Sequence, residues 1–157
     1  MILATLILVL STAIFFFYFQ VTCQRILRRQ FERDYFQSVA NVIRLEFPAL
    51  RTSLAGFGTP VDYSRLPRVL KCDFLTLTHL LNNTADVKKG YSRGQYLLIL
   101  YFQWQFLSLA LRHLLSMGEK DAVLRITSIL QYFANVVGQR LYSDGFGNLR
   151  ADYLVNH

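Results

Sequence analysis

The segment at residues 2–22 reads ILATLILVLSTAIFFFYFQVT and contains no charged side chain. At a helical rise of 1.5 Å per residue, about 20 apolar residues suffice to cross the ~30 Å hydrocarbon core of a bilayer. A secretory signal peptide would carry basic residues before the apolar run and a small-x-small cleavage site after it, and the sequence has neither. A chain of 157 residues could hardly enclose a helix that is apolar on every side. The segment therefore predicts a transmembrane anchor over residues 1–23.

Four arginines follow the apolar segment closely, and they are Arg25, Arg28, Arg29 and Arg33. Basic residues within about 15–20 positions of a span are retained on the cytoplasmic side. We therefore expect a single-pass protein with its N-terminus outside and residues 24–157 in the cytoplasm. The arginines would face the anionic headgroup layer, where they could set topology alone or also capture a specific acidic lipid. We expect no nucleic-acid partner, because the membrane would shield this cluster and no nucleic-acid-binding motif accompanies it.

Apolar residues recur at helical spacing through most of the remaining chain, and this pattern predicts an all-α fold. The first apolar stripe continues out of the membrane helix and should end or kink at Pro48. Its members are Leu27, Phe31, Tyr35, Val39 and Val42. Further helices are expected over residues 64–82, 95–117 and 119–142. The short turn between the last two predicts an antiparallel hairpin.

These helices together predict a cytoplasmic bundle of about four helices over residues 24–142. In the last helix, apolar residues share one face, and the opposite, polar face is expected to face solvent. The polar residues of that face are Ser128, Gln131, Asn135 and Gln139. Residues 143–157 are expected to form a separate tail, because Asp144-Gly145 and Gly147-Asn148 are typical of turns.

The helix expected over residues 95–117 is apolar around most of its circumference. Its polar groups project onto one narrow line, which consists of Tyr101, Gln105, Ser108, Arg112 and Ser116. Such a helix lies either at the centre of a bundle or in lipid. The glutamines and Arg112 favour a central helix over a second membrane span, and Trp104 is then expected in the core. The polar line is either a hydrogen-bonded seam between packed helices or a stripe that faces a partner.

Asp73 breaks the pattern of the helix expected over residues 64–82, because it projects into the middle of the apolar arc. A buried carboxylate is costly without a partner. Arg112, on the polar line of the next helix, is the expected partner in an internal ion pair. An exposed position against a loop and a functional carboxylate are the two alternatives.

The sequence contains no phosphate-binding loop, no metal-binding spacing of Cys and His, and no nucleophile motif. It therefore predicts no cofactor, no bound metal and no small-molecule substrate. The leading interpretation is a non-catalytic, membrane-anchored subunit or scaffold that docks on a larger membrane protein complex. The alternative is a membrane-anchored regulatory or sensor module that binds a small ligand or cofactor within its bundle. An enzyme that acts on lipid ranks third. The expected partners are the lipid bilayer and other membrane subunits.

Overall fold

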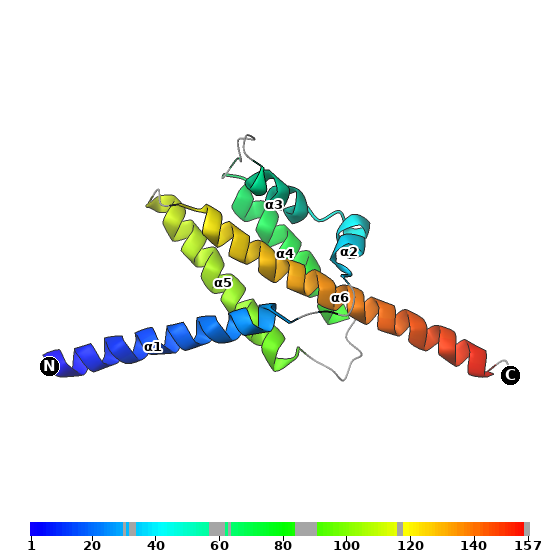
Figure 1. Cartoon of the computed structure of the whole chain (residues 1–157), viewed down its shortest axis with the longest axis horizontal. Coiled ribbons are helices and arrows are strands. Elements are labelled where there is room, and N and C mark those ends of the chain that lie inside the picture. The colour runs from blue at the N-terminus through cyan, green and yellow to red at the C-terminus, as the bar shows by residue number, and fades with distance from the viewer. Residues whose placement is uncertain are drawn as a thin grey trace.

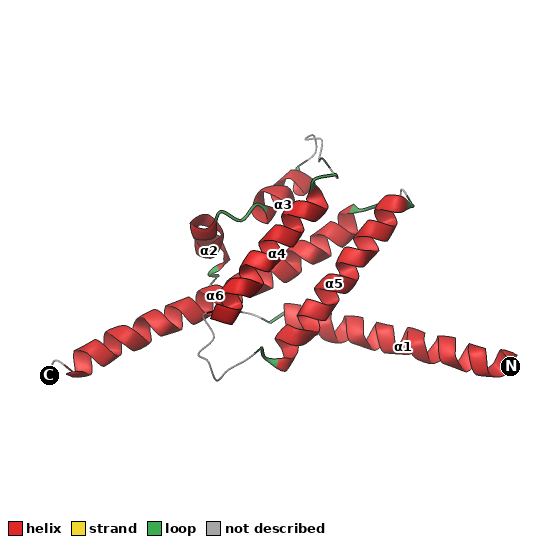
Figure 2. Ribbon diagram, turned by 180° about the vertical axis from the view of Figure 1, so that it is seen from behind, coloured by secondary structure: helices red, strands yellow, loops and turns green. Residues whose placement is uncertain are grey.

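The computed structural model describes residues 1–29, 31, 34–56, 62, 64–83, 91–115 and 118–155, with the backbone alone over 144–155. Within these ranges the chain forms six α-helices and no strand, which confirms an all-α fold with a long apolar N-terminal helix and a helical bundle. The helices are α1 (Ile2–Leu27), α2 (Phe36–Ile43), α3 (Phe47–Ala55), α4 (Leu66–Asn83), α5 (Arg93–Leu114) and α6 (Lys120–Val155). In Figure 1, and from behind in Figure 2, α1 and the end of α6 project from the bundle in opposite directions.

Helix α1 has 26 residues and a length of about 39 Å. Residues 1–18 are exposed. Its threonine hydroxyls donate hydrogen bonds to backbone carbonyls of the preceding turn, so these polar groups are satisfied without water. The bonds run from Thr5 to Ile2, from Thr12 to Leu8 and from Thr22 to Tyr18, each at 2.8 Å. In the described part of the chain, α1 is the one helix long and apolar enough to cross a membrane.

The stripe that follows α1 does not form one continuous helix, contrary to the expectation from the sequence. Helix α1 ends at Leu27. Helix α2 ends at Ile43 and is capped by Arg44, whose φ of 55° places it in the left-handed region. Pro48 is the second residue of α3, where a missing N–H removes no helical hydrogen bond, so it helps to begin a helix. Apolar spacing shows which residues share a face, but it does not show where a helix breaks.

Helices α5 and α6 form the expected antiparallel hairpin (Figures 1 and 2). Helix α6 is longer than predicted, because its 36 residues include the two expected turns at 144–148. A glycine inside a helix costs about 1 kcal/mol relative to alanine, and each residue added to an existing helix gains one backbone hydrogen bond. The turn-forming residues therefore do not end α6.

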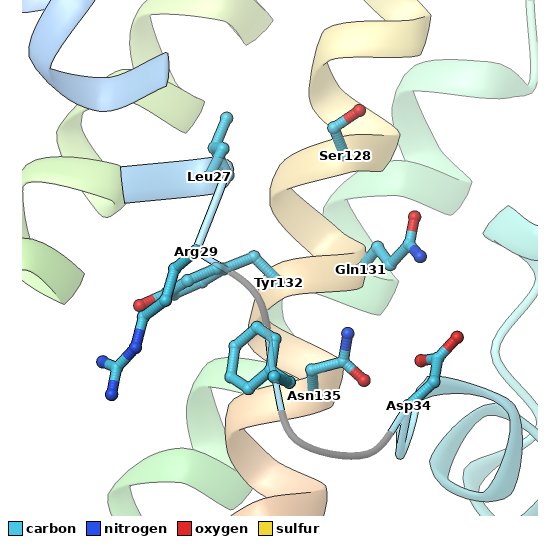
Figure 3. Close-up of a pocket in the computed structure, with 8 residues that line it drawn as sticks. Leu27, Arg29, Asp34, Ser128, Gln131, Tyr132 and Asn135 are labelled. Atoms are coloured by element: carbon cyan, nitrogen blue, oxygen red, sulfur yellow. The ribbon is translucent and has the colours of Figure 1, made fainter. Parts of the chain in front are cut away.

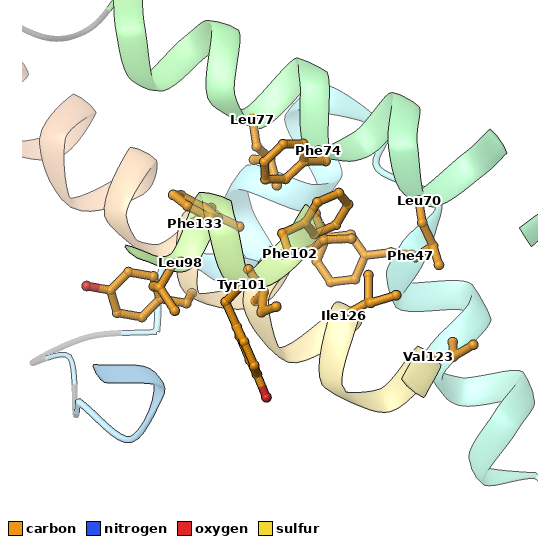
Figure 4. Packing of buried hydrophobic residues seen from close by; sticks show 14 of the residues in the cluster. Phe47, Leu70, Phe74, Leu77, Leu98, Tyr101, Phe102, Val123, Ile126 and Phe133 are labelled. Carbon is orange, nitrogen blue, oxygen red and sulfur yellow. The ribbon is translucent and has the colours of Figure 1, made fainter. Parts of the chain in front are cut away.

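Helix α6 is the central helix of the bundle, in place of the helix expected over 95–117. It packs against each of the other five helices. Its fully buried apolar residues include Val123, Ile126, Ile129, Leu130, Phe133 and Val137. Figure 4 shows the rings of Phe74, Phe102 and Phe133 together in the core. Phe74 of α4 stacks on Phe102 of α5 with ring centroids 3.7 Å apart, and Phe133 meets Phe74 edge-on at 6.0 Å.

Candidate interaction surface on α1 and α5

The C-terminal half of α1 packs antiparallel against the N-terminal half of α5. Moving three or four residues toward the C-terminus of α5 corresponds to moving the same number of residues toward the N-terminus of α1. The contacting pairs, from the bundle outward, are Ile26–Gly94, Cys23–Leu97, Phe19–Tyr101 and Phe16–Trp104. The last pair stacks its rings with centroids 4.7 Å apart. Helix α5 therefore extends alongside part of the uncharged segment 2–22.

The polar line of α5 lies on the side of the helix that is covered by its neighbours. Tyr101 and Gln105 are buried, and Ser108 and Arg112 are half-buried. Ser116 lies outside the described residues. The ring of Tyr101 meets α1 through Phe19 at 6.1 Å. The line thus starts between packed helices and becomes more exposed toward the hairpin turn.

The opposite side of α5 is apolar and exposed, and we call it the α5 stripe. It consists of Tyr96, Leu100, Trp104, Leu107, Leu111 and Leu114. Trp104 is 47% exposed, so its expected place in the core is wrong. The projection from sequence located the polar line correctly, but it could not show that this line would be the covered side. Because Trp104 stacks on Phe16, the α5 stripe is continuous with the exposed apolar surface of α1.

Three of the four arginines that were expected to set the topology lie at the end of α1. Arg25 is in the last turn of the helix, Arg28 caps it and Arg29 follows directly. All three are exposed, and Arg33 lies outside the described residues. Cations are favoured at this end, because the helix dipole places partial negative charge there. The apolar helix therefore ends in a concentrated positive charge.

Asp73 is buried, at 7% exposure, but it does not pair with Arg112. Its Oδ2 accepts hydrogen bonds from the backbone N–H groups of Glu46, at 3.0 Å, and Phe47, at 2.8 Å. These N–H groups begin α3, where no carbonyl of the same helix can accept them. Asp73 therefore caps α3 from α4. Burial raises the pKa of the Asp73 carboxyl, although the two N–H donors oppose that rise.

Arg112 lies in the last turn of α5 and contacts the connection to α6. Its guanidinium donates to the carbonyl oxygen of Gly118 at 3.2 Å. The next residue, His113, places its Nδ1 2.8 Å from Oε1 of Glu119. Both contacts join the end of α5 to the residues just before α6. The expected ion pair between Asp73 and Arg112 does not form. Asp73 instead binds the start of α3, and Arg112 binds the connection between α5 and α6.

Asn135 is a structural residue that the sequence assigned to the solvent-facing side of the last helix. It is buried, and its Oδ1 accepts the backbone N–H of Phe36, the first residue of α2, at 2.7 Å. Gln131, one turn earlier, accepts a hydrogen bond from Arg51 of α3. Helices of eight and nine residues are marginal alone, so these side chains help to fix α2 and α3 on α6. Nothing in the sequence separates Asn135 from its exposed polar neighbours.

Comparison of the chain with protein-family models, curated proteins and solved structures gives no match.

Proposed function

We propose that this protein is a non-catalytic, membrane-anchored subunit or scaffold that docks on a larger membrane protein complex through the α5 stripe. The observation that carries the proposal is the orientation of α5, which covers its polar line and leaves its apolar side open. Completing the burial of a half-exposed leucine contributes about 1 kcal/mol. The α5 stripe has six exposed apolar side chains in a row, so covering it with a partner would lower the free energy substantially.

A transmembrane or interfacial helix of another protein fits this surface. The α5 stripe presents apolar side chains at the spacing by which two helices pack. Its single tryptophan, Trp104, is of the residue type most enriched at binding hot spots. Gln103 is exposed at the edge of the stripe, and a side-chain amide near hydrocarbon is stabilised by a hydrogen bond from a neighbouring helix. Lipid tails offer no such partner.

Anchoring by α1 supports the same proposal, because it would hold the α5 stripe beside the membrane. In the proposed orientation the N-terminus lies outside and the bundle lies on the cytoplasmic side, with the part of α5 from Leu97 to Trp104 held against the end of the span. The exposed charges of Arg25, Arg28 and Arg29 support this direction. A reporter fused to the C-terminus and found outside the cell membrane would contradict it.

The buried carboxylate supports a non-catalytic role. Asp73 is the one buried carboxylate among the described side chains, and its hydrogen bonds go to the backbone of α3. General acid–base catalysis needs a carboxylate within reach of a substrate. Asp73 instead satisfies the first N–H groups of a helix, which is a structural task.

Photo-crosslinking from the α5 stripe tests the docking proposal. A photoreactive residue replaces Leu107 in the full chain in its native membrane, and the matched control replaces Leu75 of α4. Both leucines are 54% exposed. We expect position 107 to form an adduct with one membrane protein that also co-purifies at fixed stoichiometry in mild detergent. Leu111→Ser should reduce that adduct, and position 75 should not form it.

Two outcomes would contradict the docking proposal. Adducts with lipid alone from position 107 would mean that the α5 stripe faces the bilayer. Equal adducts from positions 107 and 75 would mean that the contact does not depend on the α5 stripe.

A further inference from the structure

A cavity of about 340 Å³ lies where the last turn of α1 meets α5 and α6. Its lining residues are Gln24, Leu27, Arg28, Tyr101, Arg125 and Ser128. Figure 3 shows a second cavity of about 430 Å³ that shares Leu27 and Ser128 with the first. A volume near the lower end of the range for ligand sites, with a few polar groups brought together, is typical of a small binding site.

The hydroxyl of Tyr101 is the unusual feature of this cavity. Tyr101 is 1% exposed, and Figure 4 shows its hydroxyl at the end directed away from the other labelled core residues. The hydroxyl oxygen has no hydrogen-bond partner among the described residues, although the side chains of Gln24 and Gln105 approach it. An enclosed hydroxyl without a partner costs about 1–3 kcal/mol. A ligand in the cavity that accepts a hydrogen bond from this hydroxyl would remove that cost.

The charges around the cavity favour an anion. Arg28 and Arg125 line it from α1 and α6, and neither Asp nor Glu lines it. The unpaired carbonyls at the C-terminal end of α1 carry about half a negative charge in total, and this charge repels an anion. Two full guanidinium charges exceed this half charge. Arginine also offers the paired N–H donors that suit phosphate geometry.

The position of the cavity along α1 matches the headgroup layer. Gln24 and Arg28 lie two and six residues beyond the uncharged segment, or about 3 Å and 9 Å along a helix axis normal to the membrane. The polar layer on each side of a bilayer is about 5–8 Å thick. We propose that this cavity binds a phosphate-ester anion, supplied by the headgroup of an acidic phospholipid. The inference rests on the membrane anchor of the proposed function, and it needs no protein partner.

The geometry assigns a role to each polar residue of the site. Arg28 and Arg125 neutralise the phosphate from two sides, and the Tyr101 hydroxyl donates a hydrogen bond to one of its oxygens. Gln24 offers a further amide donor at the rim, whereas the Ser128 hydroxyl already donates to the carbonyl oxygen of Leu124. The acyl chains of the lipid would run along the apolar surface of α1, which begins one turn below the cavity.

Native mass spectrometry of the full chain in neutral detergent tests the site. The probes are dioleoyl phosphatidylglycerol, dioleoyl phosphatidylcholine as the zwitterionic control, and glycerol 3-phosphate as the soluble phosphate ester. We expect one phosphatidylglycerol to bind in preference to phosphatidylcholine. Tyr101→Phe and Arg125→Gln should each weaken phosphatidylglycerol binding about tenfold, because each removes a hydrogen-bond donor to a charged group.

Arg68→Gln is the matched control for charge, because Arg68 is exposed on α4 and does not line the cavity. It should change the affinity by less than about twofold. Tyr101→Phe also separates binding from folding. Because its hydroxyl has no hydrogen-bond partner among the described residues, the free energy of unfolding without lipid should not fall.

Unchanged phosphatidylglycerol binding in Tyr101→Phe would overturn the proposal. An equal loss in Arg68→Gln would also overturn it, because the attraction would then be diffuse. Binding of glycerol 3-phosphate without binding of phosphatidylglycerol would overturn the assignment to a lipid. These results do not depend on whether the α5 stripe docks a subunit.

Discussion

Helices α5 and α6 are joined by a short turn and pack against each other, but they use their apolar residues in opposite ways. Helix α6 has polar residues along one side, yet between residues 122 and 138 most of its circumference is buried. Helix α5 is apolar almost all round, yet it leaves a whole stripe exposed. The comparison teaches that a helix becomes central by having neighbours on every side, and its own hydrophobicity does not decide this.

The polar residues of the two helices show the same contrast. On α6, Asn135 accepts a hydrogen bond from the short helix α2, and Gln131 accepts one from the short helix α3. On α5, the buried hydroxyl of Tyr101 has no partner in the described part of the chain. The hydrogen bonds of these α6 residues are thus made within the chain. Helix α5, in contrast, has an exposed apolar surface and a hydroxyl unpaired among the described residues, and a ligand or a partner could contact both.

The strongest test of the comparison is one substitution made on both helices. Leu130 of α6 is fully buried, and Leu107 of α5 is half-exposed. We expect Leu130→Ala to lower the free energy of unfolding by about 2–5 kcal/mol, because it leaves a cavity among packed neighbours. Leu107→Ala should change it by less than about 0.5 kcal/mol. Chemical unfolding of the full chain in detergent measures both, and equal losses would mean that the α5 stripe is packed within the fold.

Two glycines provide a second matched pair. A Cβ at Gly138 of α6 would lie 2.3 Å from the Cβ of Tyr35, so α2 would have to move. A Cβ at Gly94 of α5 would lie 3.6 Å from the nearest atom of Ile26, which is ordinary contact. We expect Gly138→Ala to cost about 1–3 kcal/mol and Gly94→Ala to cost nothing or to stabilise slightly. Thermal unfolding compares them, and a neutral Gly138→Ala would show that α2 is not held closely on α6.

Asp73 tests the polar contacts that hold α3. Asp73→Ala should cost about 1–2 kcal/mol, because two N–H groups of α3 lose their acceptor. Asp73→Asn keeps an acceptor oxygen and should cost less. The folded pKa of Asp73 is raised, so the unfolded chain releases this proton first as the pH rises. The free energy of unfolding should therefore fall between about pH 4 and the raised pKa, and it should stay level above it.

The pH dependence is measured by chemical unfolding of the wild type and Asp73→Asn across the acidic range. The contribution of Asp73 is the difference between the two curves. A wild type that gains stability over Asp73→Asn as the pH rises would mean that the hydrogen bonds to the carboxylate outweigh its burial.

The smallest expected effect concerns the packing of α1 on α5. Trp104 is the single tryptophan, so the tryptophan emission comes from one site, which stacks on Phe16. Phe16→Ala should shift that emission and remove the ring stacking, which contributes about 0.5–1.5 kcal/mol. Phe17 is exposed on the same helix, and Phe17→Ala is the matched control that should leave the emission unchanged. Equal emission changes would mean that α1 does not pack on α5 in this register.

Local patterns of the sequence were sufficient for the helices but not for their breaks. The uncharged segment 2–22 predicted α1, and apolar spacing predicted α4, α5 and the start of α6 to within a few residues. The stripe of Leu27, Phe31, Tyr35, Val39 and Val42 ran from α1 into α2 as one pattern, although α1 ends at Leu27 and α2 begins at Phe36. The left-handed residue Arg44 and the start of α3 at Phe47 follow that stripe, and its spacing indicates neither of them.

The sequence by itself determined which residues break a pattern, and only the tertiary structure decided what those residues contact. Asp73 stood out because a carboxylate in an apolar arc is costly, and that cost is a property of the residue and its helix. Its partners are N–H groups 26 and 27 residues away, and no spacing rule reaches them. In the same way, the residue spacing placed the polar line of α5 on one side of that helix. Its neighbours α1 and α6 decided that this side would be covered, because burial is a property of the assembly of helices.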